Sequence, residues 1–251
     1  MNILKTTLKK LFWHFGYTIS EKVEQDLAVE LENIDYDLIY YVLDSGYSMT
    51  NLPRMINTLK SCRYAVENNI PGDFLEVGVW RGGNGILARK IFEILNSEKK
   101  VWMFDTFEGM TAPTGVDVIA KTKISAQSKY SKVQNNWCFA SLEDVKNNCL
   151  DSQLDLKFFK FIKGDVLETL LIDENIPDSI CVLRLDTDWY ESTRLELEIL
   201  YPLLSKHGVL IVDDYGHWEG ARKAVDEYFL KSSFKPLLNV VDYSCRSLIK
   251  V

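Results

Sequence analysis

Hydrophobic and polar residues form alternating blocks along the chain, and their periods predict strands and helices in turn. Five short apolar runs are typical of buried strands: 72–80, 100–107, 156–165, 179–186 and 208–215. The segments that follow them repeat apolar residues at helical spacing: 83–97, 141–150, 166–171, 190–204 and 219–231. Two further apolar runs, 235–241 and 244–251, predict a final antiparallel pair. This alternation predicts an α/β domain with a mainly parallel sheet and helices on both faces.

The first 45 residues lack this alternation and predict a helical extension. Their apolar side chains share one helical face beside a short basic cluster: Leu4, Leu8, Leu11, Phe12 and Phe15. We interpret this face as packed on the rest of the chain or on a second subunit, which predicts a homo-oligomer; contact with a membrane surface is the alternative. A further helix is expected from Met49, with Thr50 as its cap. We therefore divide the chain into an extension, 1–45, and an α/β domain, 46–251.

The segment 108–137 is polar, contains glycine and proline early, and has only weak periodicity. A loop of this length within a compact domain is usually a functional lid or a disordered segment. We expect it to close over a site at the edge of the sheet.

Composition and charge exclude several classes of function. A net charge of −7 and a pI near 5.1 argue against binding to a nucleic-acid backbone, which requires a basic face. No apolar run approaches the roughly 18–20 residues that span a bilayer, so no transmembrane segment is expected. The N-terminus has no secretory signal and the five cysteines form no CxxC pair, which predicts reduced thiols in a cytoplasmic protein.

The first strand–turn–helix unit has residues suited to a nucleoside ligand. In "LEVGVWRGGNG", Glu76 and Gly78 end the strand and Gly82 begins the helix, where glycines let a ligand approach free N–H groups. The spacing matches neither G-x-G-x-x-G nor a P-loop. Asp105 ends the second strand, where a carboxylate accepts bonds from ribose hydroxyls, and Asp165 follows the third. Together these residues favour S-adenosylmethionine, while a tight packing turn and helix caps are the simpler alternatives.

Four carboxylates follow the next two strands. Asp186 and Asp188 end one strand, and Asp213 and Asp214 end the other. Because the carboxyl ends of parallel strands meet at one edge of a sheet, these acids repel one another there unless a cation is present. Mg²⁺ or another divalent cation prefers such oxygen ligands; helix capping is the alternative. His217, three residues after Asp214, is a candidate base or substrate contact.

The chain also resembles a known family at these motifs. The resemblance lies in four stretches: "YSMTNLPRMINTLKSCRYAVENNIPGDFLEVGVWRGGNG", "VWMFDTFEGM", "LRLDTDWYEST" and "GVLIVDDYGHWEGARKAVDEYF". They are similar to the macrocin O-methyltransferase family, whose members are metal- and S-adenosylmethionine-dependent enzymes that methylate sugar hydroxyls. The resemblance spans roughly residues 45–232. It implies a Rossmann-like class I methyltransferase fold, with a seven-stranded sheet and an antiparallel C-terminal strand.

The same resemblance implies roles for individual residues. It assigns three aspartates as metal ligands: Asp186, Asp213 and Asp214. It identifies Asp188 as the candidate general base, with His217 as the alternative. It places the cofactor on the turn from Glu76 to Gly82 and on Asp105.

We therefore expect an enzyme that uses S-adenosylmethionine and Mg²⁺ to methylate a hydroxyl of a sugar or a glycosylated small molecule. Three alternatives are a methyltransferase of a non-sugar vicinal diol such as a catechol, a metal-dependent sugar-phosphate hydrolase, and a noncatalytic protein that binds a nucleoside or sugar. The hydrolase has no need of the turn from Glu76 to Gly82 with Asp105. A pure binding protein has no need of four clustered carboxylates.

Overall fold

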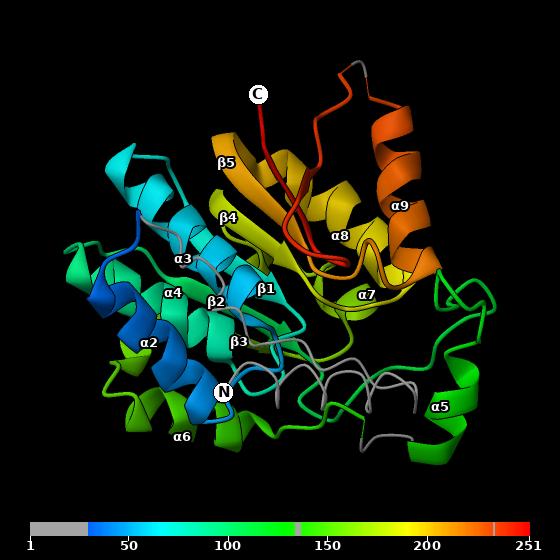
Figure 1. Cartoon of the computed structure of the whole chain (residues 1–251), viewed down its shortest axis with the longest axis horizontal. Coiled ribbons are helices and arrows are strands. Elements are labelled where there is room, and N and C mark those ends of the chain that lie inside the picture. Colours follow the sequence, from blue (N-terminus) through cyan, green and yellow to red (C-terminus); the bar gives the residue numbers. More distant parts are fainter. Residues whose placement is uncertain (1–29, 134–136, 233) are drawn as a thin grey trace, which may run out of the picture. The chain divides into compact units, whose positions relative to one another are not determined.

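The computed structural model describes residues 30–133, 137–232 and 234–251, and its elements follow the predicted alternation (Figure 1). The helices are α2 (Asn33–Asp44), α3 (Leu52–Glu67), α4 (Gly83–Ile94), α5 (Gln127–Val133), α6 (Leu142–Asp151), α7 (Val166–Thr169), α8 (Tyr190–Leu203) and α9 (Glu219–Leu230). The strands are β1 (Asp73–Val77), β2 (Val101–Asp105), β3 (Phe159–Lys163), β4 (Ile180–Leu185), β5 (Leu204–Val212), β6 (Asn239–Val240) and β7 (Arg246–Ile249). Short 3₁₀ turns occupy Leu156–Phe158 and Asp173–Asn175.

One seven-stranded sheet has the order β3-β2-β1-β4-β5-β7-β6. The strands from β1 to β5 pair in parallel, whereas β7 pairs antiparallel with both β5 and β6. This arrangement confirms the predicted α/β fold, the mainly parallel sheet and the antiparallel C-terminal strand. The chain moves outward from β1 in one direction through β3 and then resumes on the other side at β4. In open α/β sheets, ligands bind beside the carboxyl ends of strands at such a reversal.

The register of the sheet aligns the ends of its central strands. Val77 of β1 pairs with Leu185 of β4, and Leu185 pairs with Val212 of β5. The residues that follow these three, including Asp186 and Asp213, therefore lie along the same edge.

Apolar residues on one face of the strands pack against α8 and α9. Leu183 and Leu185 of β4 share a buried cluster with Leu197 of α8 and Val225 of α9. The helices α3 and α4 pack together and contact β4 and β1, respectively, from the other side of the sheet (Figure 1). Because side chains on a strand alternate between faces, Arg184 lies on the side of α3 and α4.

Three local details differ from the sequence prediction. Asn51, not Thr50, caps α3: its side chain accepts a hydrogen bond from the Arg54 N–H. The segment expected as a loop at 108–137 contains α5, a helix without buried residues and therefore without a hydrophobic stripe to reveal it. The strand expected at 235–241 is reduced to the two residues of β6.

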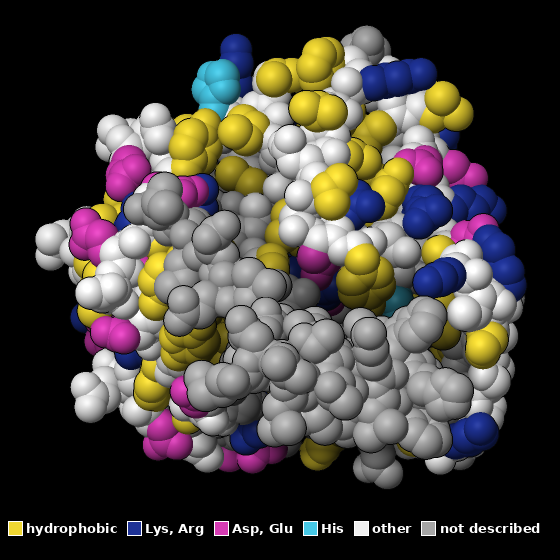
Figure 2. All heavy atoms as spheres, in the orientation of Figure 1, with side chains coloured by type: hydrophobic (Ala, Val, Ile, Leu, Met, Phe, Trp, Pro, Cys, Tyr) yellow, Lys and Arg dark blue, Asp and Glu magenta, His cyan; other side chains and the backbone are white. Residues whose placement is uncertain are grey.

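A boundary after Tyr36 divides the chain into two units, and the described part of the first is residues 30–36. The predicted amphipathic face of Leu4, Leu8, Leu11, Phe12 and Phe15 lies outside the described residues, and the domain boundary expected after residue 45 stays a prediction. Among the described helices, none is long and apolar enough to cross a membrane. Figure 2 shows Lys and Arg side chains interspersed with Asp and Glu on one face of the molecule.

Candidate active site

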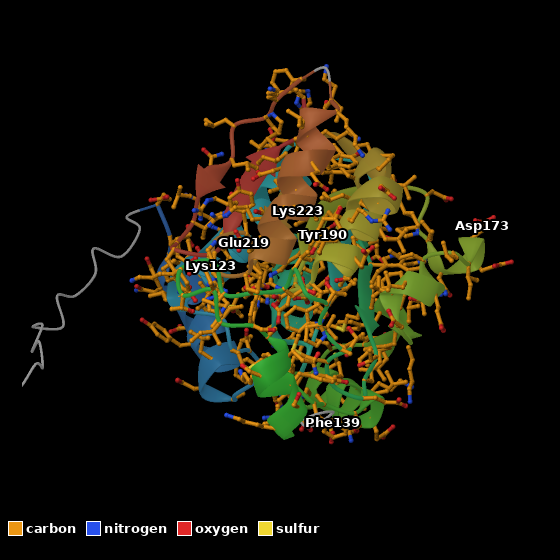
Figure 3. The ribbon with its side chains drawn as sticks, turned by 90° about the vertical axis from the view of Figure 1, so that its right-hand side faces the viewer. Lys123, Phe139, Asp173, Tyr190, Glu219 and Lys223 are labelled. Atoms are coloured by element: carbon orange, nitrogen blue, oxygen red, sulfur yellow. The ribbon has the colours of Figure 1, made fainter. Side chains whose placement is uncertain are left out.

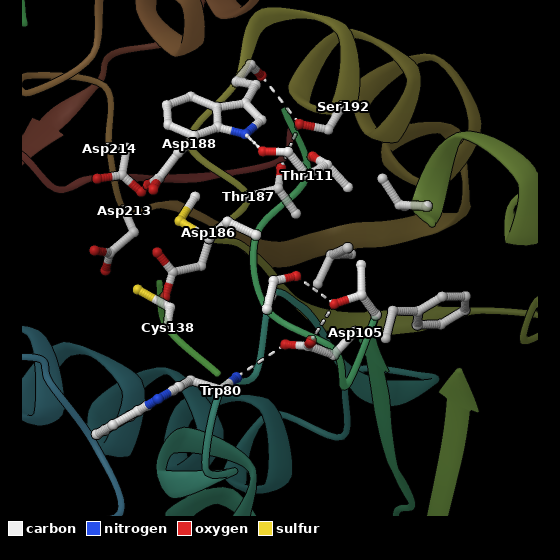
Figure 4. A pocket seen from close by; sticks show the side chains of 18 of the residues that line it. Trp80, Asp105, Thr111, Cys138, Asp186, Thr187, Asp188, Ser192, Asp213 and Asp214 are labelled. Carbon is white, nitrogen blue, oxygen red and sulfur yellow. Dashed lines mark hydrogen bonds between the residues drawn. The ribbon is translucent and has the colours of Figure 1, made fainter. Parts of the chain in front are cut away.

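A cavity of about 250 Å³ opens at the carboxyl ends of the central strands (Figure 4). Its lining includes several of the residues singled out in the sequence: Gly78, Asp105, Asp165, Asp186, Asp188, Asp213 and Asp214. Five different strands, β1 to β5, and their following loops contribute these residues. The cavity thus lies where the reversal of strand order predicts a ligand site.

At Gly78, the turn after β1 passes very close to the backbone that follows β4. The φ of Gly78, 83°, is in the left-handed region that glycine tolerates, and a Cβ atom there would lie 2.1 Å from the carbonyl oxygen of Asp186. The position therefore requires glycine, and it leaves the backbone of the turn after β1 open to the cavity.

Asp105 braces the turn between β1 and α4. Its Oδ2 accepts hydrogen bonds from the N–H groups of Val79 (2.8 Å) and Trp80 (3.0 Å), and its Oδ1 accepts one from the N–H of Phe107 (2.8 Å). Burial raises the pKa of its carboxyl group, and these backbone bonds oppose the shift. The side chain thus fixes the shape of the turn that the sequence suggested for a nucleoside ligand.

The other predicted cofactor residues occupy different surroundings. Asp165 lines the cavity and caps α7 by accepting a bond from the Leu167 N–H (2.9 Å). Glu76 and Gly82 are not among the described residues that line the cavity. Glu76 is buried against Arg184, and Gly82 is the N-cap residue immediately before α4, with a φ of 85°. Their predicted contact with a cofactor stays a prediction.

Three carboxyl groups converge on the cavity. Oxygen atoms of Asp186, Asp188 and Asp214 all lie within 4.8 Å of one another. The pKa of Asp186 is raised to about 6 and that of Asp188 to about 7, chiefly by burial and also by repulsion from nearby aspartates; the Arg184 guanidinium opposes the shift at Asp186, and a hydrogen bond to Asp214 opposes it at Asp188. Burial and the neighbouring Asp188 also raise the pKa of Asp214. Among the described residues, the buried Oδ2 of Asp214 has no hydrogen-bond partner.

A divalent cation fits this donor set. Hard cations such as Mg²⁺ bind carboxylate oxygens, and a positive charge would relieve the repulsion that raises these pKa values. The unpartnered oxygen of Asp214 supplies a free donor atom at the cluster.

The ion-pair partners of Asp213 distinguish it from Asp214. Its buried carboxylate pairs with the guanidinium groups of Arg54 from α3 and Arg184 from β4, and Arg54 also pairs with Asp242 (2.8 Å). Four aspartates were expected to converge here, and the resemblance implied Asp186, Asp213 and Asp214 as ligands; the carboxyl oxygens that lie within 4.8 Å of one another are those of Asp186, Asp188 and Asp214. The physical reason is that successive residues at a strand end point to opposite sides, so that Asp213 and Asp214 diverge.

A fully buried arginine joins the strand ends. Arg184 Nη1 donates to Glu76 Oε1 (2.8 Å) and to Asp186 Oδ2 (2.6 Å), and Nη2 donates to Asp213. Sequence reasoning missed both this residue and Arg54. The available signal was an arginine within the apolar run "ICVLRLD", because a charge buried on a central strand requires partners. Removing one partner of a buried ion pair lowers the free energy of unfolding by about 3–5 kcal/mol.

Aromatic side chains border the carboxylates. Trp189 lines the cavity and packs edge-on against Trp137 and Trp218, with ring centroids 5.8 and 5.1 Å apart. Its indole N–H donates to the carbonyl of Thr111 (3.1 Å). His217 is not among the described residues that line the cavity; its ring lies against Trp218 and its Nδ1 is 3.3 Å from the Tyr243 hydroxyl.

Comparison with known proteins gives a family match across nearly the whole chain. The model of the macrocin O-methyltransferase (TylF) family matches residues 20–248. The chain is 34% identical over 202 residues to demethyldecarbamoylnovobiocin O-methyltransferase of Streptomyces niveus, which covers 79% of this chain and 73% of the relative.

Two further proteins extend the comparison. The chain is 33% identical over 190 residues to 8-demethyl-8-(2,3-dimethoxy-alpha-L-rhamnosyl)-tetracenomycin-C 4'-O-methyltransferase of Streptomyces olivaceus, covering 73% of this chain and 67% of the relative. Among solved structures, the O-methyltransferase NovP superposes with a TM-score of 0.72 at 30% identity, covering 81% of this chain and 82% of NovP.

Proposed function

Because the chain belongs to the macrocin O-methyltransferase family and is thus an S-adenosylmethionine-dependent O-methyltransferase, we propose that it methylates a sugar hydroxyl with the aid of a divalent cation. The observation that carries this proposal is the cluster of Asp186, Asp188 and Asp214, which shares one cavity with Gly78 and Asp105. A cofactor turn and an acidic cluster facing the same space are what a cation-assisted methyl transfer requires.

The cation-binding part of the proposal involves both strand ends. Asp186 and Asp214 belong to the acidic cluster and to the ligand set implied by the sequence resemblance. We retain Asp213 as the third ligand from that resemblance, since a carboxylate oxygen accepts more than one interaction. Asp188 then remains available as the base. When bound, Mg²⁺ would stabilise negative charge on the acceptor oxygen.

The roles of the protein side chains follow from their positions. Asp188 takes the proton of the acceptor hydroxyl, because it faces the cavity beside the proposed ligands. Arg184 holds Asp186 in place through a direct ion pair. Trp189 supplies an apolar wall for an acceptor ring. S-adenosylmethionine supplies the methyl group, and the turn after β1 orients it toward this wall.

The acceptor class is tested by mass spectrometry. The protein is incubated with S-adenosylmethionine, Mg²⁺ and one acceptor: demethyldecarbamoylnovobiocin, the rhamnosylated tetracenomycin named for the second relative, or catechol. We expect a gain of one methyl group on at least one glycosylated acceptor and none on catechol. Methylation of catechol alone would transfer the proposal to non-sugar diols, and failure with all three would contradict it.

A cofactor-binding prediction concerns Asp105. Replacing it by Ala removes two hydrogen bonds from the backbone of the cofactor turn, at Val79 and Trp80, and a third from Phe107 after β2. Bonds to a charged group contribute about 1.5–3 kcal/mol, so the affinity for S-adenosylhomocysteine is expected to fall by about tenfold or more. Isothermal titration calorimetry measures this affinity.

Asp73 provides the matched control. Its carboxylate accepts hydrogen bonds from the Lys100 N–H and the Trp102 indole N–H, but it lies at the opposite end of β1 from the cofactor turn. Asp73→Ala is expected to lower thermal stability but leave the affinity unchanged. Equal affinities for Asp105→Ala and the wild type would show that the turn does not bind the cofactor.

Three further expectations stay predictions: a cytoplasmic location, a homo-oligomer formed through the N-terminal region, and a separate extension over residues 1–45. Light scattering of the full chain, compared with a chain that begins at residue 46, tests the last two together.

A further inference from the structure

The segment 111–120, here called the strap, contacts both loops that carry the clustered aspartates. The indole of Trp189 donates to its Thr111 carbonyl, the N–H of Glu219 donates to its Val118 carbonyl (2.9 Å), and its Ala120 N–H donates to the His217 carbonyl (2.8 Å). An ion pair between Lys123 and Glu219 lies just beyond it (2.7 Å; Figure 3). Immediately before the strap, Gly109 and Met110 line the cavity.

A buried carboxylate lies at the centre of the strap. Asp117 is fully buried, and its Oδ2 accepts bonds from the N–H (2.7 Å) and hydroxyl (2.8 Å) of Thr114. Its Oδ1 accepts a bond from the N–H of Tyr190, 2.9 Å away. Three donors thus compensate for the burial of this side chain.

The bond to Tyr190 joins the strap to the start of α8. Tyr190 is the first residue of this helix, and Trp189 before it makes no capping hydrogen bond with its own side chain. The first N–H groups of a helix have no partner within it, and a carboxylate is favoured there by the helix dipole. Asp117 therefore caps α8 from a distant part of the chain.

Gly220 in the first turn of α9 makes room for this contact. A Cβ atom at this position would lie 2.0 Å from Asp117 Oδ1 and 3.1 Å from the Tyr190 nitrogen. Glycine lowers helix stability, so its occurrence in α9 is explained by the close approach of the Asp117 carboxylate. Substitution of Gly220 offers a second, independent way to disturb the contact.

We propose that Asp117 is a positioning residue for the methyl transfer, fastening the strap to α8 so that the cavity wall and Asp188 are held in place. Asp188 precedes Tyr190 by two residues and has a φ of 70°, a left-handed conformation that costs free energy in a residue other than glycine. The capped start of α8 stabilises this conformation. The inference rests on the proposed function, because Asp188 is there the base.

The test compares Asp117→Ala, Asp117→Asn and Gly220→Ala with the wild type. Asp155→Ala is the matched control: Asp155 caps a 3₁₀ turn at the amino end of β3 through the Lys157 N–H, away from the cavity. Hydrogen exchange of the Tyr190 and Glu219 amides reports directly whether the strap is bonded to α8 and α9, because these amides donate to Asp117 and Val118 of the strap. Turnover is measured with demethyldecarbamoylnovobiocin, and cofactor affinity with S-adenosylhomocysteine.

We expect faster exchange of the Tyr190 amide in Asp117→Ala and Gly220→Ala, and a loss of turnover on the order of tenfold to a hundredfold, as for small misplacements of reacting groups. The exchange rate of the Tyr190 amide and the turnover of Asp117→Asn should lie between those of these variants and those of the wild type, because asparagine keeps one side-chain oxygen. Affinity for S-adenosylhomocysteine should change less than about twofold, and Asp155→Ala should match the wild type throughout.

Each outcome bears on the inference. Unchanged Tyr190 exchange in Asp117→Ala would contradict the contact itself, and faster exchange with full turnover would reduce Asp117 to a structural cap. If the wild type methylates none of the glycosylated acceptors, the proposed function fails. The exchange of Tyr190 and Glu219 then still decides whether Asp117 holds the strap to both loops.

Discussion

Asp188→Asn is expected to reduce methyl transfer by about 10²–10⁴-fold while S-adenosylhomocysteine binds as before. The amide has nearly the shape of the carboxylate, but it does not accept a proton from the acceptor hydroxyl. Asp188 lines the cavity next to Asp186 and Asp214, so the change removes a base without opening a hole. Single-turnover kinetics together with calorimetric titration of S-adenosylhomocysteine provide the measurement.

Glu191→Gln is the control for Asp188→Asn, since Glu191 lies three residues further along, pairs with Arg194 at the surface, and loses charge in the same way. It should retain full turnover. Asp213→Asn distinguishes a metal ligand from a general base. If Asp213 is a ligand, this variant binds Mg²⁺ more weakly than the wild type; if it is not, its Mg²⁺ affinity is unchanged. If Asp188→Asn weakens Mg²⁺ binding and Asp213→Asn spares it, the assignments exchange. Full turnover by Asp188→Asn would direct the search for the base to His217.

Removal of the divalent cation is expected to lower turnover by at least about a hundredfold, because charge stabilisation by a metal contributes several kcal/mol. Dialysis against EDTA should abolish transfer and added Mg²⁺ should restore it. Asp186→Ala should not recover on addition of Mg²⁺, since it removes a ligand shared by the predicted set and the observed cluster.

A readout other than activity accompanies this experiment. A ligand that binds only the folded state raises the melting temperature, so Mg²⁺ should stabilise the wild type against heat and should not stabilise Asp186→Ala. Asp173→Ala removes an exposed acid from a 3₁₀ turn and should respond to Mg²⁺ like the wild type. Turnover that survives EDTA, together with no thermal shift, would remove the cation from the mechanism.

The sequence predicted the fold well because strands and helices here have contrasting hydrophobic periods. Apart from Arg184, the run "ICVLRLD" is apolar on both faces, as is typical of a central parallel strand, and β4 occupies Ile180–Leu185. Placing Asp186 and Asp213 at one edge required only the rule that parallel strands end together. The register from Val77 through Leu185 to Val212 then brings these ends side by side.

The partners of individual carboxylates were beyond the reach of sequence patterns. Whether Asp213 or Asp214 faces the other acids depends on the twist at the end of β5, which neither periodicity nor composition encodes. The pairing of Asp213 with Arg54 joins residues of α3 and β5, and no local pattern connects these elements. Similarly, the capping of α8 by Asp117 becomes visible only when the strap is folded onto the helix.

The ion pairs of Arg54 also have a consequence for the order of events during biosynthesis. Arg54 belongs to an early helix, whereas its partners Asp213 and Asp242 lie close to the end of the chain. On the ribosome, Arg54 therefore cannot meet these two partners until most of the chain has been synthesised. Contacts between residues so distant in sequence form slowly, because a long loop must close first. The ion pairs that hold Asp213 beside the acidic cavity can accordingly be completed only after Asp242 has been synthesised.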